Sequence, residues 1–122
     1  MGRKKNQGSK WIRPLKRRAI YRRDNCRCLV CGVSESELLE REETLTLDHW
    51  VACELLAKPD NSPQNLVTMC RSCNSSKQDK TIRQWCKVLR AKEIDAADVC
   101  KRSRQQRRKD WKGHLAALKR GE

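Results

Sequence analysis

The sequence contains no phenylalanine, few aromatic residues of any kind and no long apolar run. Aromatic residues make up 4% of the 122 residues, and the hydrophobic fraction reaches 37% only because the eight cysteines are counted in it. A chain of this length forms one domain, and a chain this polar buries little apolar surface. We therefore expect a metal ion or disulfide bonds to supply stability that the core cannot.

Two further absences concern membranes and export. No stretch approaches the roughly 18 consecutive apolar residues that a transmembrane helix requires. The amino-terminal residues 1–5 are not followed by an apolar run of the signal-peptide type. These absences exclude a membrane-inserting protein and predict a cytoplasmic location. In that reducing compartment, paired cysteines favour zinc over disulfides.

Positive charge is abundant and unevenly distributed. The formal net charge is +14, from 29 basic and 15 acidic residues. Residues 3–23 hold ten basic residues and no acidic one, residues 101–109 hold six basic residues, and acidic residues gather within 35–43. An ordinary solvated surface would not segregate its charge in this way, so the pattern predicts a polyanionic partner, nucleic acid in preference to an acidic membrane or protein surface.

The cysteines fall into two groups. Four of them form two pairs with the C-x2-C spacing, which is typical of a closed structural zinc site with four protein ligands: Cys28, Cys31, Cys70 and Cys73. The other four are expected to be free and mostly buried, acting as small hydrophobic residues: Cys26, Cys53, Cys86 and Cys100. Cys26 is an alternative ligand to Cys28, although Cys28 gives the regular spacing to Cys31.

The local patterns predict an α+β fold. Expected along the chain are a helix from Pro14 to about residue 24, a knuckle at 28–32, a capped helix at 34–43, a strand at 44–49, a loop at 59–63, a strand at 66–69 and a helix at 70–79. Apolar residues at helical spacing predict a further buried helix over 82–89. A last helix is expected from Asp95 past Leu118. Because residues 101–110 lack an apolar stripe, this segment is expected to be solvated, disordered or laid on an acidic partner.

Asp48, His49, Asn65 and Asn74 have the chemistry that phosphodiester hydrolysis needs. His49 is one of two histidines and can act as a general base. Asp48 and Asn74 can offer hard oxygen ligands to Mg²⁺ or Mn²⁺. Asn65 is placed to hold either the intervening loop or the imidazole by hydrogen bonds. His114 lies far from this group and is expected to be a surface or packing residue.

These motifs together resemble the HNH endonuclease family, in its ββα-metal group with an added zinc site. The motifs that match are, in chain order, Arg23-Asp24, Cys28-x2-Cys31-Gly32, Leu47-Asp48-His49, Asn65-Leu66 and Cys70-x2-Cys73-Asn74-x2-Lys77. The resemblance covers roughly residues 22–80. It implies a small zinc-stapled, treble-clef-like ββα-metal core with flanking basic helices. We accordingly divide the chain into a flexible basic tail (1–13), a nuclease domain (14–93) and a basic carboxy-terminal helix (94–122).

The resemblance also implies a mechanism. His49 is the general base, Asp48 and Asn74 bind one divalent ion, Asn65 is the central asparagine, and Lys77 contacts a phosphate. The products carry 5′-phosphate and 3′-hydroxyl ends. Basic side chains on the two arms are expected to bind DNA: Arg17, Arg18, Arg22, Arg102, Arg104, Arg107 and Arg108.

The sequence departs from the family pattern in two places. The last position of the motif is Asn74 in place of histidine, an HNN variant that should favour Mg²⁺ and Mn²⁺. The usual proline and Gly-Gly before the central asparagine are replaced by residues 52–54 and 59–63, which bears on substrate fit more than on chemistry.

Two other functions remain open. One is a non-catalytic, zinc-stabilised DNA-binding module, which gives no reason for Asp48, His49, Asn65 and Asn74 to occur together. The other is an accessory factor of a DNA-processing machine such as a phage terminase, which is compatible with nuclease activity and with a phage-infected bacterial cell. A monomer or weak dimer is expected, and a monomer should nick one strand.

Overall fold

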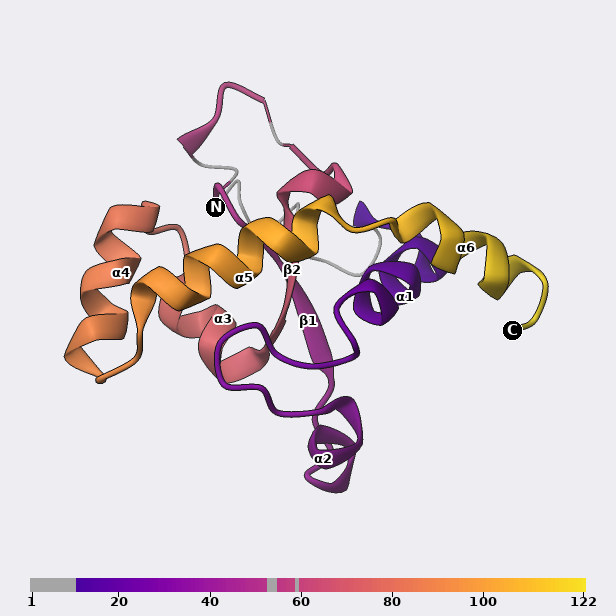
Figure 1. The fold of residues 1–122 in the computed structure, drawn as a ribbon, viewed down its shortest axis with the longest axis horizontal. Helices are drawn as coiled ribbons and strands as arrows, with labels where there is room; N and C mark the ends of the chain where they lie inside the picture. The colour runs from indigo at the N-terminus through magenta and orange to yellow at the C-terminus, as the bar shows by residue number, and fades with distance from the viewer. Residues whose placement is uncertain (1–10, 53–54, 59) are drawn as a thin grey trace.

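The computed structural model describes residues 11–52, 55–58 and 60–122. A two-stranded antiparallel hairpin stands at the centre, with helices on both sides of it (Figure 1). Residues 1–10 of the tail expected at 1–13 lie outside the described residues, as do Cys53, Glu54 and Pro59. The α+β class expected from the sequence is confirmed.

The hairpin and the helix that follows it make up the ββα unit. Strand β1 (Leu45–His49) pairs with β2 (Leu66–Cys70), so that Leu45 lies opposite Cys70 and His49 opposite Leu66. Helix α3 (Arg71–Lys77) follows β2 directly, and the Cys70 side chain accepts a hydrogen bond from the Cys73 amide as its N-cap. Because β2 pairs with β1 and leads directly into α3, the position of α3 relative to β1 is fixed.

Capping residues explain the two helices that precede the hairpin. Helix α1 (Pro14–Arg23) begins on a proline, whose missing amide proton costs nothing at a first turn. Helix α2 (Glu35–Glu40) has the predicted capping box, with Ser34 and Glu37 bonding each other's backbone amides. Between the two helices, Gly32 has a φ of +77°, the left-handed conformation that closes the first cysteine knuckle.

A buried ion pair fastens α1 to the hairpin. The guanidinium of Arg23 makes two hydrogen bonds to Asp24, of 2.7 and 2.9 Å, and both side chains are fully buried. The same guanidinium donates to the carbonyls of Pro63 and Leu66, and Asp24 accepts from the amide and hydroxyl of Thr68. Every charge is therefore matched by hydrogen bonds, as burial requires.

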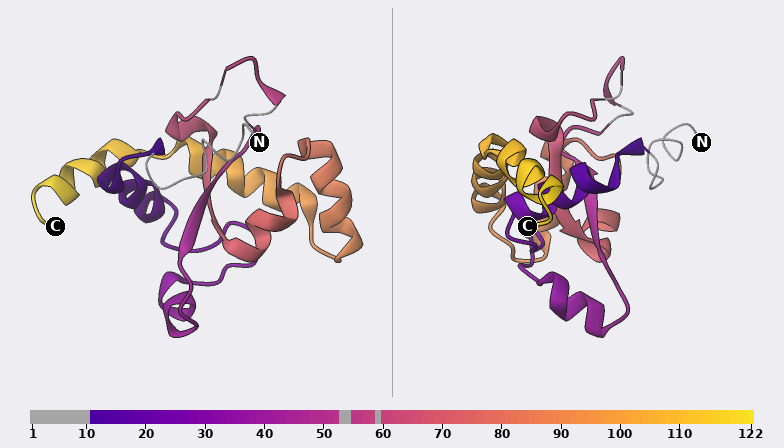
Figure 2. Two further views of the ribbon diagram at one scale, coloured as in Figure 1. Left: turned by 180° about the vertical axis from the view of Figure 1, so that it is seen from behind. Right: turned by 90° about the vertical axis from the view of Figure 1, so that its right-hand side faces the viewer.

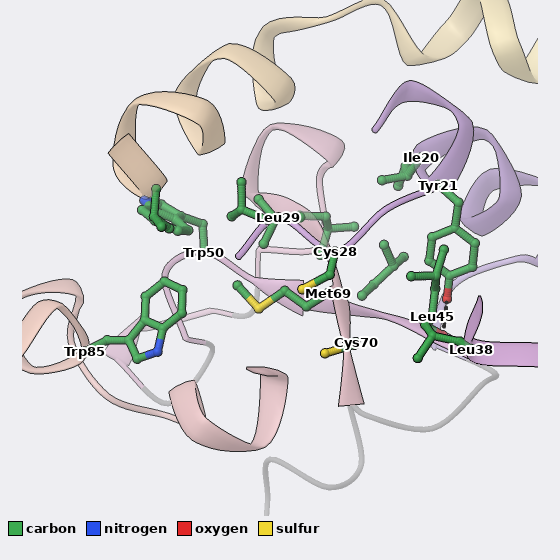
Figure 3. Close-up of a cluster of buried hydrophobic side chains, with 14 of the residues drawn as sticks. Ile20, Tyr21, Cys28, Leu29, Leu38, Leu45, Trp50, Met69, Cys70 and Trp85 are labelled. Carbon is green, nitrogen blue, oxygen red and sulfur yellow. Dashed lines mark hydrogen bonds between the residues drawn. The ribbon is translucent and has the colours of Figure 1, made fainter. Parts of the chain in front are cut away.

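The hydrophobic core is small and lies against the hairpin (Figure 3). Tyr21 of α1 donates its hydroxyl proton to the Leu45 carbonyl at 3.0 Å. Trp50, which follows β1, meets Trp85 of helix α4 (Ile82–Ala91) edge to face, with ring centroids 5.9 Å apart. The predicted stripe on α4 is confirmed for Trp85 and Leu89, which are buried.

The carboxy-terminal segment differs from the single helix expected at 94–122. It forms two helices, α5 (Ala96–Arg108) and α6 (Trp111–Lys119), because Lys109 is extended and Asp110 caps the second helix through the Gly113 amide. Helix α5 crosses the hairpin and α6 lies beside α1 (Figures 1 and 2). The domain boundary placed at residue 94 stays a prediction.

Helix α5 packs on the core instead of standing in solvent. Ala96, Val99 and Ser103 recur every three or four residues and are buried, and α5 contacts α4, β2 and the 3-10 turn η4 (Pro63–Asn65). The buried stripe was not recognised in the sequence because its residues are small.

None of the described helices has the length and apolar character needed to cross a bilayer.

The cysteines outside the two C-x2-C pairs are only in part as expected. Cys26, Cys86 and Cys100 are free thiols, but each is partly exposed and none is fully buried. The sulfurs of Cys86 and Cys100 lie 3.8 Å apart, between α4 and α5.

Candidate active site and zinc centre

The four predicted zinc ligands converge on one point. Their sulfur atoms all lie within 4.8 Å of one another, and those of Cys31 and Cys70 are 3.8 Å apart. Four sulfurs bound to zinc at about 2.3 Å in a tetrahedron lie about 3.8 Å apart. The knuckle at 28–31 and the junction of β2 with α3 thus form a cluster of the right ligand type and size.

The closeness of the four thiols affects their ionisation. The pKa of Cys28 is lowered to about 4, mainly because the Cys73 thiol donates to its sulfur. The pKa of Cys73 is raised, mainly because its proton is held in that same hydrogen bond. Burial raises the pKa of Cys31 to about 11. Four thiolates can therefore coexist here only around a cation, and the residues fit structural zinc.

Asp48 lies on the face of β1 that is turned toward α3. Its carboxylate forms an ion pair with the ammonium of Lys77, at a distance of 3.0 Å. Burial raises the pKa of Asp48, whereas the charge of Lys77 acts to lower it. Asp48 therefore depends on a neighbouring cation to stay ionised.

Lys77 is not on the surface, which corrects the phosphate contact expected for it. Its side chain is fully buried, donates to the His49 carbonyl at 2.7 Å, and lies about 6 Å from the ring centroids of Trp50 and Trp85. A buried ammonium needs such partners because it has lost its water. Lys77 holds the end of β1 onto α3.

Asn74 reaches β1 from the first turns of α3. Its amide nitrogen donates to the Thr46 hydroxyl at 2.9 Å and toward the Leu47 carbonyl at 3.4 Å. These bonds use the amide nitrogen, so the ligand atom that Asn74 could offer a metal ion is its side-chain oxygen. Asn74 and Asp48 together present one amide and one carboxylate oxygen on the α3 side, a donor set that suits Mg²⁺ or Mn²⁺.

His49 ends β1 and points to the other face of the hairpin, as strand alternation requires. Its Nε2 lies 2.7 Å from Oδ1 of Asn61. One face of the ring is covered by Trp11, with centroids 4.9 Å apart. Neither neighbour was identified from the sequence, where only the polar loop 59–63 hinted at Asn61.

Asn65 holds the loop, which is one of the two roles considered for it. Its side chain accepts from the Val51 amide and donates to the Val51 and Asp60 carbonyls, at 2.9 to 3.1 Å. Its own carbonyl accepts from the Trp50 amide at 2.7 Å. The chain is therefore clamped just after His49 and just before Asn61.

The basic residues of α1 have mixed surroundings. Arg17 donates to the Tyr21 hydroxyl and lies over the Trp11 ring. Arg18 forms a 2.8 Å ion pair with Glu35 of α2. Arg22 is partly exposed. Their proposed contact with DNA stays a prediction.

Two of the four α5 arginines are used within the fold. Arg102 bonds Asp98 and the Leu29 carbonyl. Arg107 lies 5.1 Å from the Trp50 ring centroid, and burial lowers its pKa. The remaining two, Arg104 and Arg108, are exposed. The four α5 arginines that were expected to bind DNA therefore form two pairs with different surroundings.

His114 is partly exposed on α6, consistent with a surface or packing residue.

Comparison with known proteins finds a family that part of the chain resembles. Residues 26–80 match the model of the HNH endonuclease family. Among solved structures, the chain is similar to the Type II-C Cas9 enzyme from Actinomyces naeslundii, with 21% identity and a TM-score of 0.46 over 88% of this chain. It spans only 13% of that enzyme's length. No curated protein matches the chain significantly. The matched segment contains both cysteine pairs, the hairpin and α3, and over this segment the chain is similar to the HNH endonuclease family.

Proposed function

We propose that the protein is a DNA endonuclease that depends on a divalent ion for cleavage and on zinc for its fold. The observation that carries the proposal is that strand β1 carries Asp48 and His49 next to each other, while Asn74 of α3 bonds to the same strand. Asp48 and Asn74 lie on the α3 side, and His49 lies on the opposite side. The positive charge of the chain supports a polyanionic substrate.

In the proposed reaction, His49 removes a proton from a water molecule, and the water oxygen forms a new bond to phosphorus. The bond from phosphorus to the 3′ oxygen breaks, and that oxygen takes a proton from solvent. The products are a 5′-phosphate and a 3′-hydroxyl. When bound, Mg²⁺ or Mn²⁺ would stabilise the negative charge that develops on the phosphate oxygens. Asp48 and Asn74 would hold the ion.

The substrate must open the site. Only 2% of His49 is exposed, so a phosphodiester reaches the imidazole only after neighbouring side chains, including Trp11, have moved. DNA binding is therefore coupled to a local rearrangement in this proposal. One ββα unit has one site, so a monomer should cut one strand at a time.

The chemistry of the ends tests the function. A supercoiled plasmid incubated with the protein and Mg²⁺ should become nicked, and DNA ligase should reseal the nick without prior phosphorylation. Ligation requires the 5′-phosphate and 3′-hydroxyl that the mechanism gives. Nicks that ligase can seal only after kinase treatment would contradict the assignment of the broken bond.

The exposed pair on α5 should bind DNA phosphates, whereas the pair used within the fold should not. We expect Arg104→Gln with Arg108→Gln to weaken binding to all DNA sequences alike. The slope of log affinity against log salt should fall by up to about 0.9 for each phosphate that the variant no longer neutralises. Fluorescence anisotropy of labelled DNA across a salt series measures this slope.

The matched control is Arg102→Gln with Arg107→Gln, which removes the same charge. These side chains bond the Leu29 and Gln64 carbonyls, so this double variant should mainly lower the free energy of unfolding. An unchanged salt slope for the Arg104 and Arg108 variant would show that α5 is a solvated or protein-docking surface.

A further inference from the structure

The loop between the strands brings a second asparagine to the base. Asp60 Oδ1 accepts from the amide and the hydroxyl of Ser62, at 3.0 and 2.6 Å, and so closes a tight turn around Asn61. Asn65 fixes the Asp60 carbonyl from the other side at 3.0 Å. The backbone on each side of Asn61 is thus held by local bonds, and its side chain is directed at His49.

The contact with His49 distinguishes the two ring nitrogens. Oδ1 of Asn61 lies 2.7 Å from Nε2, and an amide oxygen can only accept a hydrogen bond. Nε2 must therefore carry the proton in the neutral ring, and Nδ1 keeps a free lone pair. A neutral histidine in water exchanges between both tautomers, so a single acceptor on Nε2 selects one of them.

We propose that Asn61 is a positioning residue for the general base: it holds the proton on Nε2 of His49 and leaves Nδ1 to take the proton from water. This inference rests on the proposed function, because it identifies the ring nitrogen of His49 that accepts the proton from water. Trp11 restrains the plane of the same ring, at a centroid distance of 4.9 Å. Asn65 acts one step further away, by holding the loop that presents Asn61.

Two variants separate an orienting role from a structural one. Asn61→Asp keeps an acceptor in the same place and should keep the tautomer. Asn61→Leu has a side chain of similar size but no acceptor, so His49 should exchange between both tautomers. Gln64→Leu is the matched control, since it makes the same kind of change at an exposed side chain of the same loop. Zinc content and melting temperature should be similar in all three.

The tautomer is read directly by long-range ¹H–¹⁵N NMR correlation at about pH 8.5, well above the ordinary imidazole pKa of about 6.5. The chain has only two histidines, so His114 serves as a reference in every spectrum. We expect His49 to be protonated on Nε2 alone in the wild type and in Asn61→Asp. In Asn61→Leu, both tautomers should appear and the signals of His114 should not move.

The rate of DNA cleavage should depend on the tautomer of His49. Loss of a group that orients a functional histidine typically costs about 10- to 100-fold. We therefore expect the single-turnover rate of Asn61→Leu to fall by that factor at an unchanged KM for DNA, and Asn61→Asp to retain most of the rate.

A wild-type protein with the proton on Nδ1 would overturn the inference, even if the leucine variant failed to fold. So would an Asn61→Leu protein that keeps both the Nε2 proton and the rate. A wild type that shows the Nε2 proton but cuts no DNA would instead overturn the proposed function.

Discussion

Cys73→Ser should leave the protein without zinc and largely unfolded. Cys73 supplies one of four sulfurs within 4.8 Å of one another, and its helix, α3, also carries Asn74 and Lys77. Binding of structural zinc contributes on the order of 10 to 16 kcal/mol, as much as the whole stability of a typical domain at about 5 to 15 kcal/mol. The small core cannot replace it. Elemental analysis and circular dichroism of the purified variant measure both effects.

Cys86→Ser is the control for this substitution. It exchanges the same atoms at a partly exposed cysteine outside the four-sulfur cluster. We expect about one zinc per chain and near wild-type melting for the control. A Cys73→Ser protein that is folded and free of zinc would refute the zinc framework.

His49→Ala should lower the single-turnover rate of cleavage by at least about 10² to 10⁴, the usual contribution of a positioned general base. This corresponds to roughly 3 to 5 kcal/mol of transition-state stabilisation. DNA affinity should change little, because phosphate contacts come from lysine and arginine side chains. Rates are measured with protein in excess over plasmid, and affinities with labelled DNA.

His114→Ala removes the only other imidazole and should cut DNA as the wild type does. If His49→Ala cuts as fast as His114→Ala, the base is wrongly assigned. If neither the wild type nor any variant cuts, the rival interpretation, a non-catalytic DNA-binding module, gains support.

The sequence predicted the ββα core well because each of its parts has a local signal. The capping box at Ser34, the alternation over β1 and the two C-x2-C pairs each depend on neighbours in the chain. The break at Lys109 was missed because Asp110 was not recognised as a new N-cap. The packing of α5 was missed because its buried stripe is made of small residues.

The site was predicted as a set of residues, but not as a set of contacts. Asp48 and His49 are neighbours on β1 and Asn74 bonds to the same strand, whereas the roles of all three stay proposals. Lys77 was misplaced because helical spacing does not reveal which long side chain turns inward to meet a buried carboxylate. Asn61 was missed because its contact with His49 depends on the path of a long loop, which no local pattern determines.

The most direct test of the account is the conversion of supercoiled plasmid by the wild-type protein, with zinc content measured in the same samples. With Mg²⁺ or Mn²⁺ the plasmid should be nicked. Mild EDTA should abolish nicking while about one zinc per chain remains bound, and added Mg²⁺ should restore it, because four cysteines leave zinc no open coordination position. Undiminished cleavage in EDTA, or no cleavage by folded, zinc-loaded protein supplied with Mg²⁺, would contradict the account.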